Sequence, residues 1–277
     1  MVELVDSSAE SQILELEYIG STQQPFDFGV QDSAGFLLTS NPNFYGALLV
    51  AGSEYDAQNE HHQISLAKAA FFNSSLPIIV DGSTVAFHSM SAGNVSIDNF
   101  LLNNITQTIT RPDMIVDTLG CQYILLSKDG IGGEGFQYDG NHRYTWAIGG
   151  TLDFASDSES INSAPKLHVI SPSERYPISL SSDLYTRWSG GGISIRIIIY
   201  DVKEATEPKQ ILCLRIKKNI GSVIIPVEIL QLLPKGRNSF LFSFTTENTT
   251  ITHINGFQDN ILVRAEYNHN LLLQIRD

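Results

Sequence analysis

Apolar and polar residues alternate along most of the C-terminal half of the chain. Between residues 193 and 200, isoleucine occupies every second position: Ile193, Ile195, Ile197 and Ile199. A period of two is that of a strand with one buried face, and β-branched residues favour strands. The same alternation predicts strands at 166–171, 178–188, 210–217, 222–225, 239–246, 261–267 and 271–275, with a turn at 268–270 between the last two. This density of short strands predicts a β-sandwich.

Two segments depart from this pattern. Residues 226–233 begin with a proline and place Leu230 and Leu233 on one helical face, which predicts a single helical turn. Residues 63–72 fit a short helix and a strand equally well. The rest of the N-terminal half again alternates, with strands expected at 14–18, 84–90, 94–100, 121–127 and 143–148. The fold class predicted is therefore all-β, with two β-sandwich-like domains.

Charge is distributed unevenly along the 277 residues. Residues 1–150 carry 17 acidic and 4 basic side chains, whereas residues 151–277 carry 13 of each. This asymmetry suggests two units, and the acidic, serine-rich stretch that ends at Pro165 is typical of a linker. We therefore expect a polar N-terminal tether at 1–12, an acidic all-β domain at 13–155, a linker at 156–165 and a β-sandwich at 166–277. The acidic excess argues against a nucleic-acid partner, which needs clustered lysine and arginine.

Four stretches carry a resemblance to a known group of proteins. They are YTWAIGGTLDF at 144–154, PKLHVISP at 165–172, TRWSGGG at 186–192 and IPVEILQLLPKG at 225–236. Together they resemble the C-terminal immunoglobulin-like part of exported, lipoprotein-like Bacteroidetes proteins, over residues 144–277. The resemblance implies an immunoglobulin-like C-terminal domain and an exported, periplasmic or cell-surface location. It carries no functional residues with it.

Several single residues are predicted to belong to the core. Cys121 and Cys213 lie in apolar alternating runs and are expected to be unpaired thiols. Trp146 and Trp188 also lie on strands and are expected to be buried, because such rings bury a large area. No apolar run approaches the ~20 residues that a membrane-spanning helix requires.

A glycine-rich segment at 128–143 contains the spacing G-x-G-x-x-G at Gly130, Gly132 and Gly135. A dinucleotide-binding turn must open a helix, and residues 136–140 predict none. We expect a mobile loop of a hairpin between the strands at 121–127 and 143–148. Its hard oxygen ligands make calcium possible, although such groups are more often simply solvated; they are Asp129, Glu134, Asp139 and Asn141.

Aromatic residues in predicted loops offer flat apolar faces on which a sugar could stack. Together with the loop's polar groups, they give the candidate ligand-binding set: Tyr45, Tyr55, Asp129, Glu134, Phe136, Tyr138, Asp139 and Asn141. His61 and His62 follow Glu60, but neighbouring residues on a strand point to opposite faces and no H-E-x-x-H is present. A polar loop is the favoured interpretation there.

These observations favour a non-enzymatic, exported or cell-surface protein with a binding or structural role and a protein or glycan partner. A carbohydrate-binding protein that uses the loop aromatics is the alternative. A hydrolase is the third hypothesis, and it would need a site assembled in space, because no G-x-S-x-G surrounds any serine. No catalytic residue, resident metal or cofactor is predicted, apart from the possible calcium.

Overall fold

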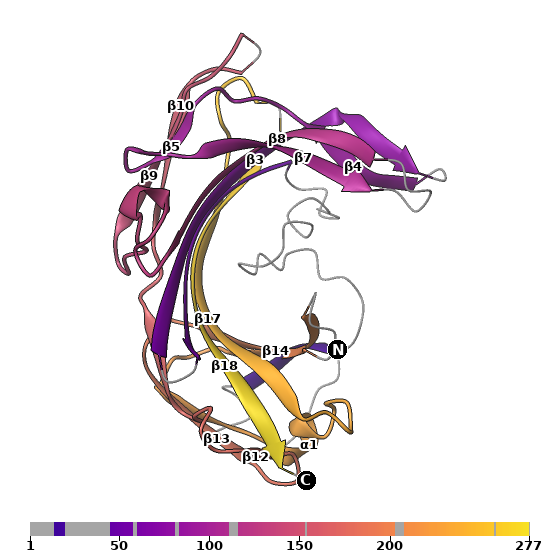
Figure 1. Cartoon of the computed structure of the whole chain (residues 1–277), viewed down its shortest axis with the longest axis vertical. Helices are drawn as coiled ribbons and strands as arrows, with labels where there is room; N and C mark the ends of the chain where they lie inside the picture. Colours follow the sequence, from indigo (N-terminus) through magenta and orange to yellow (C-terminus); the bar gives the residue numbers. More distant parts are fainter. Residues whose placement is uncertain are drawn as a thin grey trace.

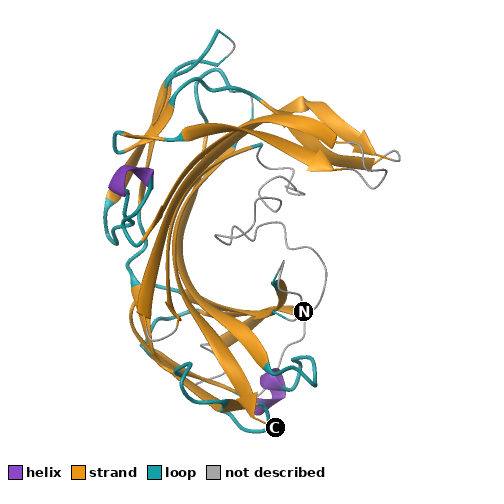
Figure 2. Ribbon diagram, viewed as in Figure 1, coloured by secondary structure: helices purple, strands orange, loops and turns teal. Residues whose placement is uncertain are grey.

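The computed structural model describes residues 14–19, 45–57, 60–80, 83–110, 116–152, 154–202, 208–257 and 259–276. These residues form strands with very little helix, which confirms the all-β class (Figure 2). The helical elements are η1 (Gly133–Gly135) and α1 (Val227–Leu230). Within the described ranges, neither is long enough to cross a membrane.

One large, strongly curved sheet dominates the molecule (Figure 1). Its central path runs β1-β15-β14-β17-β18-β2-β3-β8-β7, with β12 paired to β18 and β4 paired to β3. The strands are β1 (Leu14–Ile19), β2 (Gly46–Ala57), β3 (Glu60–Val80), β4 (Ser83–Ser89), β7 (Asn103–Thr110), β8 (Val116–Lys128), β12 (Ile178–Ser179), β14 (Ile195–Asp201), β15 (Lys209–Ile216), β17 (Ser239–Thr252) and β18 (Ile261–Arg276). Strand β18 runs parallel to β2, whereas β2 pairs with β3 in the antiparallel sense.

Two smaller sheets lie against the outer side of this curve, which we call the convex face (Figure 1). One has the order β10-β9-β5-β6 and the other β11-β13-β16. Their strands are β5 (Val95–Ile97), β6 (Phe100–Leu101), β9 (Arg143–Ile148), β10 (Asp157–Asn162), β11 (Leu167–Ser171), β13 (Leu184–Gly190) and β16 (Ser222–Ile225). The arrangement is sandwich-like, with one large layer and two small ones.

The main core fills the space between the convex face and the two small sheets. Alternate residues of the large sheet enter it, such as Leu48 of β2 and Ile197 of β14, which are both fully buried. Trp146 of β9 and Trp188 of β13 enter from the other side and are buried, as predicted. Cys121 and Cys213 are not joined by a disulfide; Cys213 is buried and Cys121 is half-buried.

The predicted linker at 156–165 is instead part of the structure. Residues 157–162 form β10, which pairs with β9, and Ile161, Ser163 and Ala164 are buried. Within this acidic, serine-rich composition, Ile161 points inward, whereas its neighbour Asn162 is exposed and Ser160 is half-buried. The large sheet and its core also contain residues from both sides of the predicted boundary. Independent folding of residues 166–277 stays a prediction.

The sheet pairing corrects two local predictions and decides a choice that the sequence left open. The expected turn at 268–270 lies inside β18, where Asn268 accepts a hydrogen bond from Thr245 at 2.6 Å. Residues 63–72 belong to β3 and are a strand. Strands β8 and β9 lie in different sheets, so the glycine-rich segment between them crosses from one sheet to another and does not close a hairpin. The helical turn after Pro226 is confirmed as α1.

Candidate metal centre

Strand register brings Glu54 and His269 side by side. In the parallel pairing of β2 with β18, Glu54 is the partner of His269, and two residues earlier Gly52 is the partner of Tyr267. Because side chains alternate along a strand, all of these positions share the convex face with Leu48. A slip by one residue would move the whole set to the other face.

A third ligand comes from the smaller sheet β11-β13-β16. His168 of β11 places its Nδ1 3.0 Å from Oε1 of Glu54, and Nδ1 of His269 contacts the same oxygen. One donor atom from each of these three residues lies within 4.8 Å of the other two. We call Glu54, His168 and His269 the Glu54 cluster. The second carboxylate oxygen, Oε2, accepts a hydrogen bond from the hydroxyl of Tyr267 at 2.7 Å.

The cluster lies at the edge of the core. Glu54 is 8% exposed and His269 is 1% exposed, whereas the side chain of His168 is 57% exposed. Burial works against ionisation of Glu54, but hydrogen bonds from His269, Tyr267 and His168 outweigh it and lower the pKa of Glu54 to about 2. Burial is the largest cause that raises the pKa of Tyr267, and the contact with Glu54 is the next. The phenol therefore keeps its proton and donates a hydrogen bond to Glu54. The carboxylate is therefore a negative charge held near the core.

A glycine makes room for the rings beside the cluster. A Cβ at Gly52 would lie 2.6 Å from Cγ of Tyr138 and 2.7 Å from Cδ2 of Tyr267. The two rings lie over β2 at this point, with centroids 5.4 Å apart. Glycine at position 52 therefore allows the close packing that holds the Tyr267 hydroxyl against Glu54.

The donor set indicates a class of ion. Imidazole nitrogen suits zinc and the first-row transition metals, whereas calcium takes oxygen ligands. An ion such as Zn²⁺ sits about 2.0–2.2 Å from nitrogen and oxygen donors, which places those donors about 3–3.5 Å from one another. The 3.0 Å between His168 and Glu54 falls in that range. Among the described residues, this is the one group of three histidine, cysteine or acidic side chains with ligand spacing.

Sequence reasoning missed all three residues of the Glu54 cluster. Glu54 is 114 positions from His168 and 215 from His269, so no motif connects them. The available signal was strand periodicity. Glu54 lies an even number of residues after Leu48 and Val50, and His269 an even number after Val263, so both polar residues fall on the buried face of their strands. A polar residue at a buried strand position needs a partner.

Two of the four aromatic residues in the predicted ligand-binding set lie in the core. Phe136 and Tyr138 are each 1% exposed and belong to the core, so a sugar has no access to their faces. Two hydrogen bonds hold Tyr138 in this inward position. The backbone N–H of Tyr138 donates to Ser65 Oγ, and the hydroxyl of Tyr138 donates to the carbonyl oxygen of Ala164. Tyr45 and Tyr55 are half-buried; Tyr45 packs edge-on against Phe87 at 5.0 Å between ring centroids.

The predicted carboxylates of the glycine-rich segment stay apart from one another. Asp129 accepts hydrogen bonds from the Gln63 N–H at 2.7 Å and from His62 at 2.9 Å, and these, the backbone bond first, lower its pKa. The others, Glu134, Asp139 and Asn141, are exposed. Asp129, Glu134 and Asp139 do not form a group with ligand spacing in the described structure.

Histidines 61 and 62 lie at the start of β3 and not in a polar loop. Their side chains take opposite directions, as expected for a strand: His62 meets Asp129, whereas His61 lies 3.6 Å from Oε2 of Glu54. His61 is thus a further imidazole next to the Glu54 cluster.

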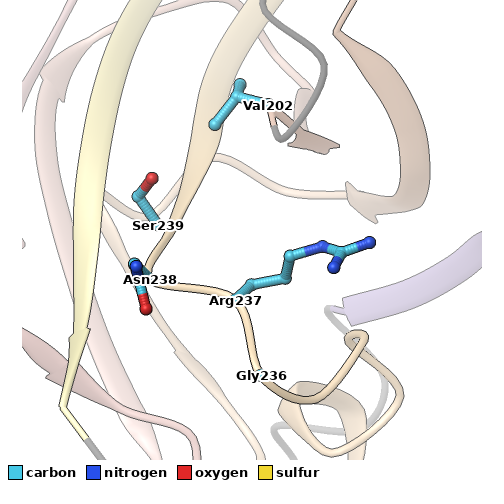
Figure 3. Close-up of a pocket in the computed structure, with 5 residues that line it drawn as sticks. All are labelled: Val202, Gly236, Arg237, Asn238 and Ser239. Carbon is cyan, nitrogen blue, oxygen red and sulfur yellow. The ribbon is translucent and has the colours of Figure 1, made fainter.

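A small pocket of about 250 Å³ opens elsewhere, at the start of β17 (Figure 3). Its lining consists of Val202, Gly236, Arg237, Asn238 and Ser239. The guanidinium of Arg237 donates to Asp201 at 2.8 Å and is already neutralised. The pocket contains no residue of the Glu54 cluster and supplies no further ligand.

Comparisons with known proteins leave the family open. No family model matches the chain, and no curated protein matches it. Two solved structures are similar over 85% of this chain and 99% of their own: the yeast delta-COP-I mu-homology domain, at 8% identity and a TM-score of 0.26, and the same domain complexed with a Dsl1 WxWxV peptide, at 9% and 0.27. At these TM-scores the likeness supports no inference about function.

Proposed function

We propose that this protein binds a divalent first-row transition-metal ion, with Zn²⁺ as the reference case, and that its role is non-enzymatic. The observation that carries the proposal is the Glu54 cluster, in which one carboxylate and two imidazoles from three strands place their donor atoms within 4.8 Å of one another. This combination of nitrogen and oxygen donors is the one that such ions prefer.

The surroundings of His269 support the same assignment. Its Nε2 is buried without a hydrogen-bond partner among the described residues, so the polar contacts of the ring are made through Nδ1, on the side of Glu54. The ring therefore directs Nδ1 at the carboxylate of Glu54, where an ion of the cluster would meet it.

The position of the cluster indicates a structural role for the ion. His168 belongs to a small sheet, whereas Glu54 and His269 belong to the large one. An ion held by all three would fasten one layer to the other and would stabilise the native state, because it binds the folded protein and not the unfolded chain. An exported or cell-surface location with a protein partner remains part of the proposal. Burial of Phe136 and Tyr138 disfavours the carbohydrate alternative.

Metal titration of the full chain tests this function. Protein stripped with a chelator is titrated with Zn²⁺ by calorimetry, and its thermal unfolding is followed with and without the ion. The variant is His168→Ala, because this side chain is exposed and its loss does not open a cavity in the core. The matched control is His142→Ala, which removes an exposed histidine paired with Asp98 at 2.6 Å, outside the cluster.

We expect one Zn²⁺ per chain, a higher unfolding temperature with the ion, and at least about tenfold weaker binding in His168→Ala, since loss of even an outer-shell partner costs that much. His142→Ala should bind like the wild type. Equal binding by wild type and His168→Ala, or no binding by either, would overturn the proposal and leave the cluster as a hydrogen-bonded network only.

A further inference from the structure

We infer that His61 is a fourth protein ligand of the same ion, oriented by Asp56, so that the site is a closed set of three imidazoles and one carboxylate. This inference rests on the proposed function, since it concerns the ion held by Glu54, His168 and His269. It adds a residue that the spacing of those three donors does not include.

Strand pairing places His61 on the correct face. In the antiparallel pairing of β2 with β3, His61 is the partner of Asp56, which lies two residues after Glu54 on the same face of β2. Nδ1 of His61 lies 3.1 Å from Oδ1 of Asp56, and its Nε2 lies 3.6 Å from Oε2 of Glu54. The ring therefore bridges two carboxylates, one on each nitrogen.

The chemistry of these contacts calls for a cation. An ionised carboxylate only accepts hydrogen bonds, so Asp56 accepts one from Nδ1–H of His61, and the tautomer with this proton has its lone pair on Nε2. That lone pair then faces a second acceptor, Glu54, at 3.6 Å, which is beyond the ~3.2 Å limit of ordinary N–H···O bonds. A metal ion between Nε2 and the carboxylate satisfies both atoms.

The Asp56–His61 pair also has the form of a second shell. Metal-binding histidines usually donate their other ring N–H to a carboxylate, which fixes the tautomer and the orientation of the ring. Asp56 is thus a positioning residue for His61. The His61 side chain is 53% exposed, so it has the freedom to close the remaining distance once an ion is bound.

A fourth protein ligand changes the character of the site. Catalytic zinc sites keep one position for water or substrate, whereas structural sites are closed by four protein ligands. With His61 in place, the ion has its full tetrahedral set. The site would then hold the layers together and would not activate a water molecule.

Cobalt spectroscopy of the full chain tests this step. Co²⁺ replaces Zn²⁺ in such sites, and its visible d–d bands are intense in tetrahedral sites and weak when water raises the coordination number. The variants are His61→Ala and Asp56→Asn, and His62→Ala is the matched control, because it removes the neighbouring histidine on the opposite face of β3. His168→Ala reports on the site itself.

We expect wild type and His62→Ala to give the intense tetrahedral bands. His61→Ala should still bind Co²⁺, at least about tenfold more weakly, with weak bands of higher coordination. Asp56→Asn should lower the affinity and keep the tetrahedral bands. If His61→Ala matches the wild type in affinity and spectrum while His168→Ala loses the ion, His61 is not a ligand and the proposed function stands. Unchanged affinity in Asp56→Asn removes its positioning role. Absence of Co²⁺ binding by wild type overturns both proposals.

Discussion

Acidic side chains occur in two parts of the molecule with opposite surroundings. In the glycine-rich segment 128–143, Asp129, Glu134 and Asp139 follow one another closely along the chain, yet they are exposed and do not converge. Glu54 lies with Asp56 at the end of the otherwise mostly apolar strand β2, yet it is buried and touches two imidazoles and a tyrosine hydroxyl. Water already solvates the first set, whereas the second must be satisfied by the protein or by an ion.

This difference shows that closeness in sequence is a poor guide to a site in a β protein. Residues in one loop often point apart, because each turn of the backbone redirects the next side chain. Residues on neighbouring strands meet with a fixed spacing that the register sets. Glu54 and His269 are register partners, and this is what makes their contact specific.

The largest expected effect comes from the aromatic residues of the glycine-rich segment. Phe136→Ala should lower the free energy of unfolding by about 3–5 kcal/mol, because it removes a ring from the core. Gln137→Ala next to it is exposed and should change that free energy by no more than about 0.5 kcal/mol. Urea denaturation measures both. Similar values for the two variants would mean that Phe136 does not pack as described.

A smaller effect is expected at the glycine beside the cluster. Gly52→Ala should cost about 1–3 kcal/mol, because the new methyl group overlaps the rings of Tyr138 and Tyr267. Displacement of Tyr267 should also weaken Zn²⁺ binding. Gly135→Ala is the control: its Cβ meets nothing within 4 Å, and only its positive φ is strained. It should lose some stability and keep the affinity of wild type. Equal Zn²⁺ affinity in both variants would contradict the role given to Gly52.

The unfolding free energy at alkaline pH should depend on the buried phenol of Tyr144, which follows the glycine-rich segment. Burial raises the pKa of Tyr144 from 10 to about 12, although a hydrogen bond from the Asp139 N–H opposes this. The folded state thus holds the proton more tightly, and this contribution to stability is complete below pH 10 and lost as pH rises toward 12. Tyr144→Phe should flatten the fall in unfolding free energy between pH 10 and pH 12. An unchanged slope would show that Tyr144 titrates normally.

The smallest effect is expected from calcium. Because Asp129, Glu134 and Asp139 do not converge, millimolar Ca²⁺ should move the unfolding temperature less than one equivalent of Zn²⁺ does. The combined change Asp129→Asn, Glu134→Gln and Asp139→Asn should leave the response to Zn²⁺ intact. If Ca²⁺ raises the unfolding temperature and the three changes abolish this rise, the glycine-rich segment is an ion site after all. The contrast drawn between its acidic residues and Glu54 would then be wrong.

The sequence predicted the strands better than their arrangement. The alternation in 195–201 and 143–148 defines β14 and β9, because one face of each strand is buried. Composition was misleading at 156–165, since the acidic and serine residues of β10 concealed its buried Ile161. Alternation says nothing of which strand lies beside which, and so the neighbours of Glu54 could not be predicted.

Residue type was similarly ambiguous within loops. Aromatics among glycines suggested an exposed surface for Phe136 and Tyr138, but the segment crosses between two sheets and passes over their shared core. The predictions for Trp146 and Trp188 were confirmed because both lie on strands of regular period. Where the period ends, burial depends on the path of the chain in three dimensions.

The parallel pairing of β2 with β18 has a consequence for how the molecule is made. The two strands are separated by most of the chain, with 215 positions between Glu54 and His269. During synthesis from the N-terminus, one edge of β2 lacks its partner strand until residues 261–276 emerge. Closing so long a loop is slow, and an open strand edge invites pairing with other chains. Pairing of β18 with β2 therefore brings together the large sheet and the ligand set in the same event, so that ion uptake would report the formation of this strand pair.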